Sequence, residues 1–242
     1  IMINHIAWIM DGNRRYSKKK NIALKEAYKL GMEQFLHVLD FQIKENIPHM
    51  SFFALSSDNY KKRSESELKP IVELIQDFFE DETIIEFFIK NSFNLSIRGD
   101  YKEIKNKQTN LKKKEREFLN TLEEKFNEIN QKTQKPKFFA HIALNYDGEK
   151  ELVFAFKQLL KKGFTEKEIT IQKIKEHIYF NDVKAPEIIV RPGDAPRLSG
   201  FMLFDSKYSE IYFSKKLWPE LTENDFKEII IWYSNQKRNF GN

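Results

Sequence analysis

The stretch HIAWIMDGNRRY, residues 5–16, joins a short apolar segment to a polar turn. Residues 6–10 are apolar throughout, and a run of this length and composition is typical of a buried β-strand. Gly12 permits a tight turn directly after Asp11. The stretch therefore places a carboxylate at the carboxyl end of a predicted strand.

The same pattern returns along the chain, where β-prone stretches alternate with amphipathic ones. The further predicted strands are residues 49–55, 94–98, 138–144 and 187–190. Helical spacing marks residues 36–43 and 71–78, and longer helices are predicted at about 101–131 and 223–237, the last with Thr222 as its N-cap. Because parallel strands need crossover connections, this alternation predicts an α/β fold with a mostly parallel central sheet flanked by helices.

Bulk composition narrows the class of protein. The 242 residues include no cysteine and no Gly/Ser/Pro-rich linker, so we expect one domain over residues 1–242 and no disulfides. No apolar run approaches the ~20 residues of a membrane span, and the apolar amino end lacks the basic segment of a signal peptide. We therefore expect a soluble, cytoplasmic protein. Much of the net charge of +5 lies in residues 105–114 and 132–137, which we interpret as solvated surface.

Polar residues follow four of the predicted strands. Asp11 follows the first strand, residues 56–59 follow the second, residues 145–148 follow the fourth, and Arg191 follows the fifth. In sheets of parallel strands, ligands bind beyond the carboxyl ends of the strands. We therefore predict that these four segments meet at one cleft.

Two of these segments have the composition of phosphate-binding loops. Residues 11–15 combine a glycine turn, successive backbone N–H groups and two arginines, and the carboxylate of Asp11 suits Mg²⁺ held beside a phosphate. Residues 191–200 hold two arginines and a serine, which suits a second diphosphate. Each loop taken alone is also typical of an ordinary surface turn. Together they favour an enzyme that joins two phosphorylated substrates.

Motifs for other chemistries are missing from the sequence. The chain contains neither G-x-x-x-x-G-K-[ST] nor G-x-G-x-x-G, which argues against nucleotide cofactors. Its five histidines show neither H-x-H nor H-E-x-x-H spacing, so we expect structural histidines rather than a zinc site. The positive charge lacks interleaved aromatic residues, and we predict no nucleic-acid partner.

Five blocks of sequence occur in order: HIAWIMDGNRRY at 5–16, MSFFALSSDNYKKR at 50–63, SIRGD at 96–100, HIALNYDG at 141–148 and EIIVRPGDAPRLSGFMLFDSKYSEIYFSKKLWPEL at 187–221. Together they resemble the cis-prenyltransferase family of the undecaprenyl diphosphate synthase type, over essentially the whole chain. The resemblance implies a Mg²⁺-dependent homodimer that condenses isopentenyl diphosphate repeatedly onto an allylic diphosphate such as farnesyl diphosphate. The product would be a long cis-polyprenyl diphosphate, the undecaprenyl precursor for cell-wall synthesis, released with transient contact at a membrane surface.

The resemblance also implies roles for individual residues. Asp11 and Glu210 would hold Mg²⁺, Asp11 would assist departure of the allylic diphosphate, and Asn59 would take part in proton removal. Isopentenyl diphosphate would bind Arg191, Arg197 and Ser199. The allylic diphosphate would lie against Gly12, Asn13, Arg14, Arg15, Tyr16, Tyr28, Ser56, Tyr60 and Lys62. Arg238 would reach the active site of the neighbouring subunit.

The chain departs from the family pattern at several of these positions. Tyr28 stands where histidine is usual and Leu24 replaces a common arginine, which removes donors for a diphosphate. Arg14 stands in place of glycine and can restore part of the lost charge. Lys62 replaces an arginine, which keeps the charge but loses the bidentate geometry.

These departures leave an alternative open, namely a non-catalytic subunit of the same fold that binds a prenyl lipid or a catalytic partner. Retention of a metal-binding carboxylate together with the opposing arginines argues against this alternative. The abundant phenylalanines also have two interpretations. They would either line a hydrophobic tunnel between the sheet and the helices or form ordinary core, and we expect a mixture at Phe78, Phe79, Phe87 and Phe88.

Overall fold

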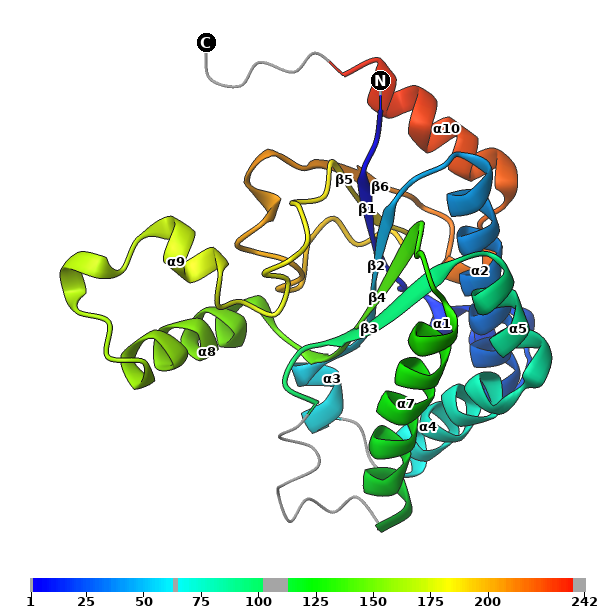
Figure 1. Cartoon of the computed structure of the whole chain (residues 1–242). Helices are drawn as coiled ribbons and strands as arrows, with labels where there is room; N and C mark the ends of the chain where they lie inside the picture. Colours follow the sequence, from blue (N-terminus) through cyan, green and yellow to red (C-terminus); the bar gives the residue numbers. More distant parts are fainter. Residues whose placement is uncertain (1, 63–64, 102–112, 237–242) are drawn as a thin grey trace.

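The computed structural model describes residues 2–62, 65–101 and 113–236, which form a parallel sheet covered by helices (Figure 1). Among these residues the sheet has six strands in the order β3-β4-β2-β1-β5-β6. The strands are β1 His5–Ile9, β2 His49–Ser56, β3 Phe93–Arg98, β4 Phe138–Tyr146, β5 Ile188–Arg191 and β6 Glu210–Phe213. The five predicted strands are all present, and β6 was not predicted. β6 is short and half-exposed, so it lacks the apolar run that marked the others.

Helices connect the strands, as the crossover argument requires. They are α1 Asn13–Lys20, α2 Leu24–Lys44, α3 Ser57–Lys62, α4 Glu65–Glu80, α5 Glu82–Lys90, α7 Lys113–Lys132, α8 Gly148–Lys161, α9 Ile171–Lys175 and α10 Glu223–Ser234. Short 3₁₀ turns occur at Glu166–Glu168, Ser206–Tyr208 and Trp218–Glu220. Within the described ranges, no helix is both long and apolar enough to cross a membrane.

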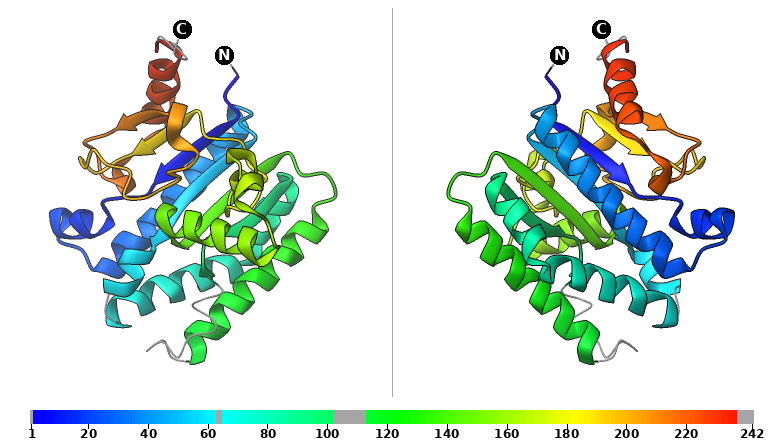
Figure 2. Two further views of the ribbon diagram at one scale, coloured as in Figure 1. Left: turned by 90° about the vertical axis from the view of Figure 1, so that its left-hand side faces the viewer. Right: turned by 90° about the vertical axis from the view of Figure 1, so that its right-hand side faces the viewer.

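The two faces of the sheet carry alternate side chains of each strand. Ile6 and Trp8 of β1 point to the side that α2, α4, α5, α7 and α10 cover, which we call the helix-covered face (Figures 1 and 2). His5, Ala7 and Ile9 point to the opposite side, which α8, α9 and loops cover and which we call the thin face.

The helix-covered face contains the larger hydrophobic core, which includes the four phenylalanines singled out in the sequence. Phe79 and Phe88 are buried there, and the ring of Phe79 lies 4.8 Å from that of Phe126 and 5.9 Å from that of Phe88. Phe78 and Phe87 pack against the same core. The expected mixture is therefore wrong for these four residues, which are core residues and do not line the cavity described below.

Candidate active site

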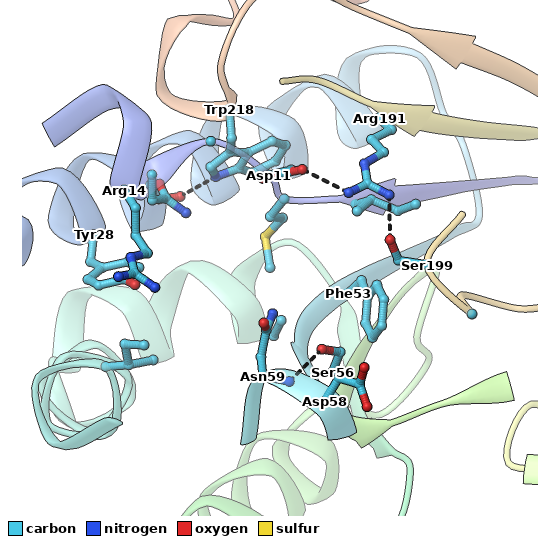
Figure 3. Close-up of a pocket in the computed structure, with 18 of the residues that line it drawn as sticks. Asp11, Arg14, Tyr28, Phe53, Ser56, Asp58, Asn59, Arg191, Ser199 and Trp218 are labelled. Atoms are coloured by element: carbon cyan, nitrogen blue, oxygen red, sulfur yellow. Dashed lines mark hydrogen bonds and ion pairs between the residues drawn. The ribbon is translucent and has the colours of Figure 1, made fainter. Parts of the chain in front are cut away.

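A cavity of about 880 Å³ opens beyond the carboxyl ends of the strands (Figure 3). Its walls come from the ends of β1, β2 and β5 and from the segment after β4, represented by Asp11, Ser56, Arg191 and Asp147. These four strands are neighbours in the sheet, so their carboxyl ends meet at one edge. The predicted convergence of four strand ends is confirmed.

Most of the predicted site residues line this cavity. They are Asp11, Gly12, Asn13, Arg14, Arg15, Tyr28, Ser56, Asn59, Lys62, Arg191, Arg197 and Ser199. Segments far apart in the sequence therefore share one wall, and the two basic loops lie on the same side of the cavity in contact with each other.

The carboxylate of Asp11 joins the two basic loops. Its Oδ2 lies 2.8 Å from Nη2 of Arg191, and its Oδ1 lies 3.2 Å from Nη2 of Arg15. Arg191 also donates to Oγ of Ser199 at 2.7 Å (Figure 3). It donates to the carbonyl of Arg197 as well. Its side chain is only 5% exposed, and its Nε has no hydrogen-bond partner. A buried guanidinium with a free donor at a cavity wall is suited to an anionic ligand.

Two glycines allow this close approach of the loops. Gly193 has φ of +100°, and a Cβ there would lie 2.6 Å from Nη2 of Arg15. Arg15 donates through Nη1 to the carbonyl of Gly193. Gly12 has φ of +117°, and a Cβ there would lie 2.9 Å from Cβ of Leu217. A side chain at either position would strain the backbone, and at Gly193 it would also push the two basic loops apart.

The amino end of α1 borders the cavity next to this pair. Gly12 is its N-cap and supplies no side-chain cap, and the first turn contains no acidic residue. Unsatisfied N–H groups and the helix dipole make such an end favourable for anions. Oδ1 of Asn13 is buried without a partner, and Gly31 leaves it room, since a Cβ at Gly31 would lie 2.5 Å away.

The opposite wall comes from the start of α3. The N–H of Asn59 donates to Oγ of Ser56 at 3.1 Å, which fixes the turn between β2 and α3 (Figure 3). Lys62 pairs with Asp58 at 3.1 Å, so part of its charge is neutralised within the helix. Ser57 donates to the carbonyl of Asn145 at 3.0 Å, which ties α3 to the end of β4.

Three predicted residues lie elsewhere. Tyr16 does not line the cavity, and its ring lies 5.9 Å from Nζ of Lys20. Tyr60 packs against the core of the helix-covered face. Glu210 begins β6 beside Ile188, at the amino end of the sheet, whereas the cavity lies at the carboxyl end. The structure therefore does not bring Glu210 to Asp11 of the same chain, and a role of Glu210 in holding the metal ion stays a prediction. Arg238 lies outside the described residues.

Sequence reasoning missed several residues of the cavity. An apolar part is lined by Met32 of α2, by Phe53 and Ala54 of β2 and by α4 residues Ile71, Leu74 and Ile75. Trp218 closes the wall and donates from its indole N–H to the carbonyl of Gly31 at 2.9 Å. Asp58 and Asp147, which lie in two of the segments predicted to converge, add acidic groups to the cavity together with Glu149. The helical spacing of Ile71 and Ile75 was visible in the sequence, but it does not distinguish a core from a cavity wall.

The side chains at the cavity wall could hold Mg²⁺ only together with a phosphate ligand, which would supply further oxygen atoms for the coordination. Among the described residues, no group of three His, Cys, Asp or Glu side chains could hold a metal ion. Asp11 is a single carboxylate at the cavity wall, close to two arginines. Mg²⁺ commonly takes one or two carboxylates and fills its shell with water and phosphate oxygens, so Asp11 fits this mode.

Comparisons with known proteins agree with this arrangement. Residues 9–241 match the model of the prenyltransferase family described as undecaprenyl diphosphate synthase. An isoprenyl transferase from Thermotoga maritima is 31% identical over 239 residues, which cover 98% of this chain and 96% of that protein. These matches place the protein among the prenyltransferases.

Two crystal structures share the fold. A "probable undecaprenyl diphosphate synthase" from Campylobacter jejuni has a TM-score of 0.75 at 28% identity, and the match covers 100% of both chains. Lavandulyl diphosphate synthase from Lavandula x intermedia, in complex with dimethylallyl diphosphate, has a TM-score of 0.86 at 24% identity and covers 100% of this chain and 99% of that one. The chain belongs to the undecaprenyl diphosphate synthase family, and it is a cis-prenyltransferase that elongates prenyl chains. The non-catalytic alternative is therefore set aside.

Proposed function

We propose that the enzyme condenses isopentenyl diphosphate repeatedly with an allylic diphosphate of the farnesyl type and makes a long-chain cis-polyprenyl diphosphate, the undecaprenyl carrier-lipid precursor for cell-wall synthesis. The observation that carries the proposal is the junction of two basic loops by the Asp11–Arg191 pair, beside an apolar cavity wall. Such a site holds two anionic groups close together and leaves room for a hydrocarbon.

The amino end of α1 would bind the allylic diphosphate. Asn13 and Arg15 would contact it together with backbone N–H groups of the first turn of this helix. Arg14 would add a second guanidinium from the same turn, which offsets the histidine that Tyr28 replaces. Ser56 and Lys62 would face the ligand from the opposite wall.

The loop after β5 would bind isopentenyl diphosphate. Arg191 already orients Ser199 and the carbonyl of Arg197, so the three residues form a prearranged group. In each cycle the terminal alkene carbon of isopentenyl diphosphate bonds to C1 of the allylic substrate, the allylic diphosphate leaves with the bonding pair, and a proton is lost from C2. Asn59, across the cavity, would take part in the removal of that proton. Correct positioning of two bound reactants supplies much of the acceleration in such a step.

Asp11 would hold Mg²⁺ against the allylic diphosphate. When bound, the ion would neutralise charge on the leaving group. The arginines beside Asp11 would orient its carboxylate and keep the two diphosphates at a fixed separation.

The growing chain would extend along the apolar wall. Ile71, Leu74 and Ile75 offer it a water-excluding surface, while its diphosphate stays at the polar end. The enzyme would act as a homodimer, with transient contact to a membrane surface during product release.

Replacement of Asp11 tests this assignment. Asp11→Ala should reduce incorporation of labelled isopentenyl diphosphate onto farnesyl diphosphate by about 100-fold or more in the presence of Mg²⁺, as for loss of a charge-stabilising group. Circular dichroism should show a folded protein, and the allylic substrate should still bind. Asp182→Asn is the matched control, because Asp182 pairs with Arg98 outside the cavity. Unchanged turnover in Asp11→Ala would remove Asp11 from the mechanism, and absence of any elongated product from the unmodified protein would refute the proposed reaction.

A further inference from the structure

Helix α1 and the start of α2 concentrate positive charge in one part of the molecule. Residues 13–29 include seven basic residues and one acidic residue, a net charge of +6 compared with +5 for the whole chain. Lys18, Lys19 and Lys20 end α1, and all three are exposed. Lys25 and Lys29 are exposed on the first turns of α2, which packs against α1. This segment is therefore strongly basic and accessible to a partner.

Little of this charge is neutralised within the chain. Nζ of Lys19 lies 2.6 Å from Glu220, and Arg15 contacts Asp11 at the cavity wall. The exposed lysines of the segment that have no ion-pair partner among the described residues are Lys18, Lys20, Lys25 and Lys29. Their combined potential extends into the solvent over about 8 Å at physiological salt. The segment therefore favours a partner whose surface is negatively charged.

Helix α1 leads away from the cavity. Asn13, Arg14 and Arg15 line the cavity, whereas the three lysines at the carboxyl end of α1 do not. None of the residues of this helix, which the structure describes in full, is buried. Figure 2 shows the helix, in dark blue, standing out from the rest of the molecule. These lysines are therefore placed for a partner outside the cavity rather than for a ligand within it.

A lipid bilayer has the chemistry that this segment fits. A bilayer with anionic phospholipids presents an extended negative surface, and each lysine near it contributes separately to binding. Tyr16 lies on the same helix outside the cavity, with its ring 5.9 Å from Nζ of Lys20. Tyrosine is enriched at the boundary between membrane and water. A single small anion would engage only a few of the lysines, so the spread of charge favours a lipid surface.

We propose that α1 and the first turn of α2 dock the enzyme on a bilayer that contains anionic phospholipids, with Lys18, Lys20 and Lys25 against the headgroups. The proposal rests on the membrane contact of the proposed function and assigns its surface. Docking through α1 brings the cavity close to the headgroups, because the amino end of α1 borders the cavity. The diphosphate of a polyprenyl product would lie at the same level once its hydrocarbon enters the bilayer.

Sedimentation with lipid vesicles tests this surface without any need for turnover. The unmodified chain should bind vesicles of phosphatidylglycerol and phosphatidylcholine in equal parts and should be released by added salt. It should not bind vesicles of phosphatidylcholine alone. Combined Lys18→Gln, Lys20→Gln and Lys25→Gln should lower the partition coefficient by on the order of 100-fold, since each lysine near the surface contributes about a factor of five.

A matched control removes the same charge from the opposite end of the sheet. Exposed lysines flank the amino ends of β3 and β4, whereas the cavity lies at the carboxyl ends. The control variant combines Lys90→Gln, Lys135→Gln and Lys137→Gln. It should bind the anionic vesicles nearly as well as the unmodified chain, and an equal loss in both variants would contradict docking through α1.

A fluorescent label tests the orientation of the docked enzyme. The chain contains no cysteine, so Ala23→Cys, at an exposed position between α1 and α2, carries a single environment-sensitive dye. With anionic vesicles the emission of this dye should shift to shorter wavelength. The same dye at Lys135→Cys should not respond. A response at position 135 without one at position 23 would show that another surface meets the lipid.

Three further results would overturn the proposal. One is full vesicle binding by the α1 variant, and another is no binding of the unmodified chain to anionic vesicles, with or without binding to double-stranded RNA. The third is loss of binding when inorganic diphosphate is added at constant ionic strength, which would place the headgroups inside the cavity. Because lipid binding is the readout, a chain that docks but forms no polyprenyl product would contradict only the proposed reaction. A chain that is active in detergent but does not sediment with vesicles would contradict only the docking surface.

Discussion

The two faces of the sheet are built by different means. On the helix-covered face, Trp8 packs edge-on against Trp218 and Phe226, with ring centroids 6.0 and 5.6 Å away. On the thin face, His5 of the same strand donates through Nδ1 to the carbonyl of Lys184 at 2.7 Å, and its Nε2 is hydrogen-bonded to Oγ of Ser51 at 2.7 Å. Alternate residues of β1 therefore face an apolar core and a buried polar network.

That network extends across four strands. His141 contacts Ser96 at 2.7 Å and His49 at 3.2 Å, and Arg98 donates to Ser96 at 3.0 Å. Arg98 also holds Asp182 of the covering loop at 2.7 Å. Apolar packing tolerates changes of partner, but a buried polar network depends on every member being satisfied. The helix-covered face should therefore respond to lost volume, and the thin face should respond to protonation and to single lost hydrogen bonds.

Loss of volume on the helix-covered face has the largest expected effect. Trp8 is fully buried, so Trp8→Ala should lower the free energy of unfolding by about 3–5 kcal/mol, measured by urea denaturation. Trp8→Phe is the control, because it keeps the ring and removes an indole N–H that has no partner. If Trp8→Phe is as destabilising as Trp8→Ala, packing volume is not the cause.

The second largest expected effect is a loss of stability at acidic pH, which arises from the histidines of the thin face. Burial lowers the pKa of His5 to about 3 and lowers the pKa of His141 and His49. The unfolded chain therefore binds more protons than the folded one below the ordinary histidine pKa of about 6.5, and stability falls as pH decreases through that range. Burial raises the pKa of Glu151 to about 7, which acts in the opposite direction, and also raises that of Asp205.

The net loss between pH 7 and pH 5 should be about 2 kcal/mol, because more than one histidine outweighs the carboxyl groups. Urea denaturation at both pH values measures it. Glu151→Gln should steepen the loss, since it removes the main opposing group. A chain that is more stable at pH 5 than at pH 7 would show that the histidines are not neutral in the folded state.

Loss of a single hydrogen bond of the network should lower the free energy of unfolding less than Trp8→Ala or the change from pH 7 to pH 5 does. Ser51→Ala removes the partner of His5 Nε2 in a fully buried place and should cost about 1–2 kcal/mol. Ser51→Thr keeps the hydroxyl and tests whether the bond or the space matters. An unchanged unfolding midpoint in Ser51→Ala would mean that His5 does not need this partner.

The sequence supported the fold better than the details of the site. Five strands and the meeting of four strand ends followed from apolar runs and from the rule that parallel strands share an edge. β6 was missed because a four-residue strand at an edge has no distinctive pattern. Glu210 was assigned to the metal ion from the family resemblance alone, and the strand register shows that within this chain it lies at the end of β6 away from the cavity.

The sequence also did not predict which side chains of a segment line the cavity and which pack elsewhere. Tyr16 and Tyr60 lie within segments that border the cavity, yet neither residue lines it, and Tyr60 packs against the core instead. Phe79 follows Ile75 by one turn of α4, and only the packing shows that Phe79 belongs to the core whereas Ile71 and Ile75 line the cavity. The histidine network was not anticipated, because its members are far apart in the sequence and meet only through the strand register.

The smallest expected effect concerns a helix end on the helix-covered face, where the sequence prediction was local and correct. Thr222 caps α10: its hydroxyl accepts from the N–H of Asp225 at 3.5 Å, and Asp225 accepts from the N–H of Thr222 at 2.7 Å. Thr222→Ala should therefore lower the free energy of unfolding by about 1 kcal/mol. Thr222→Ser keeps the cap and should be close to neutral in the same urea titration. An equal loss in both variants would assign the effect to the methyl group of Thr222, and the cap would then contribute less than the apolar residues of α10 that it precedes, such as Phe226 and Ile229.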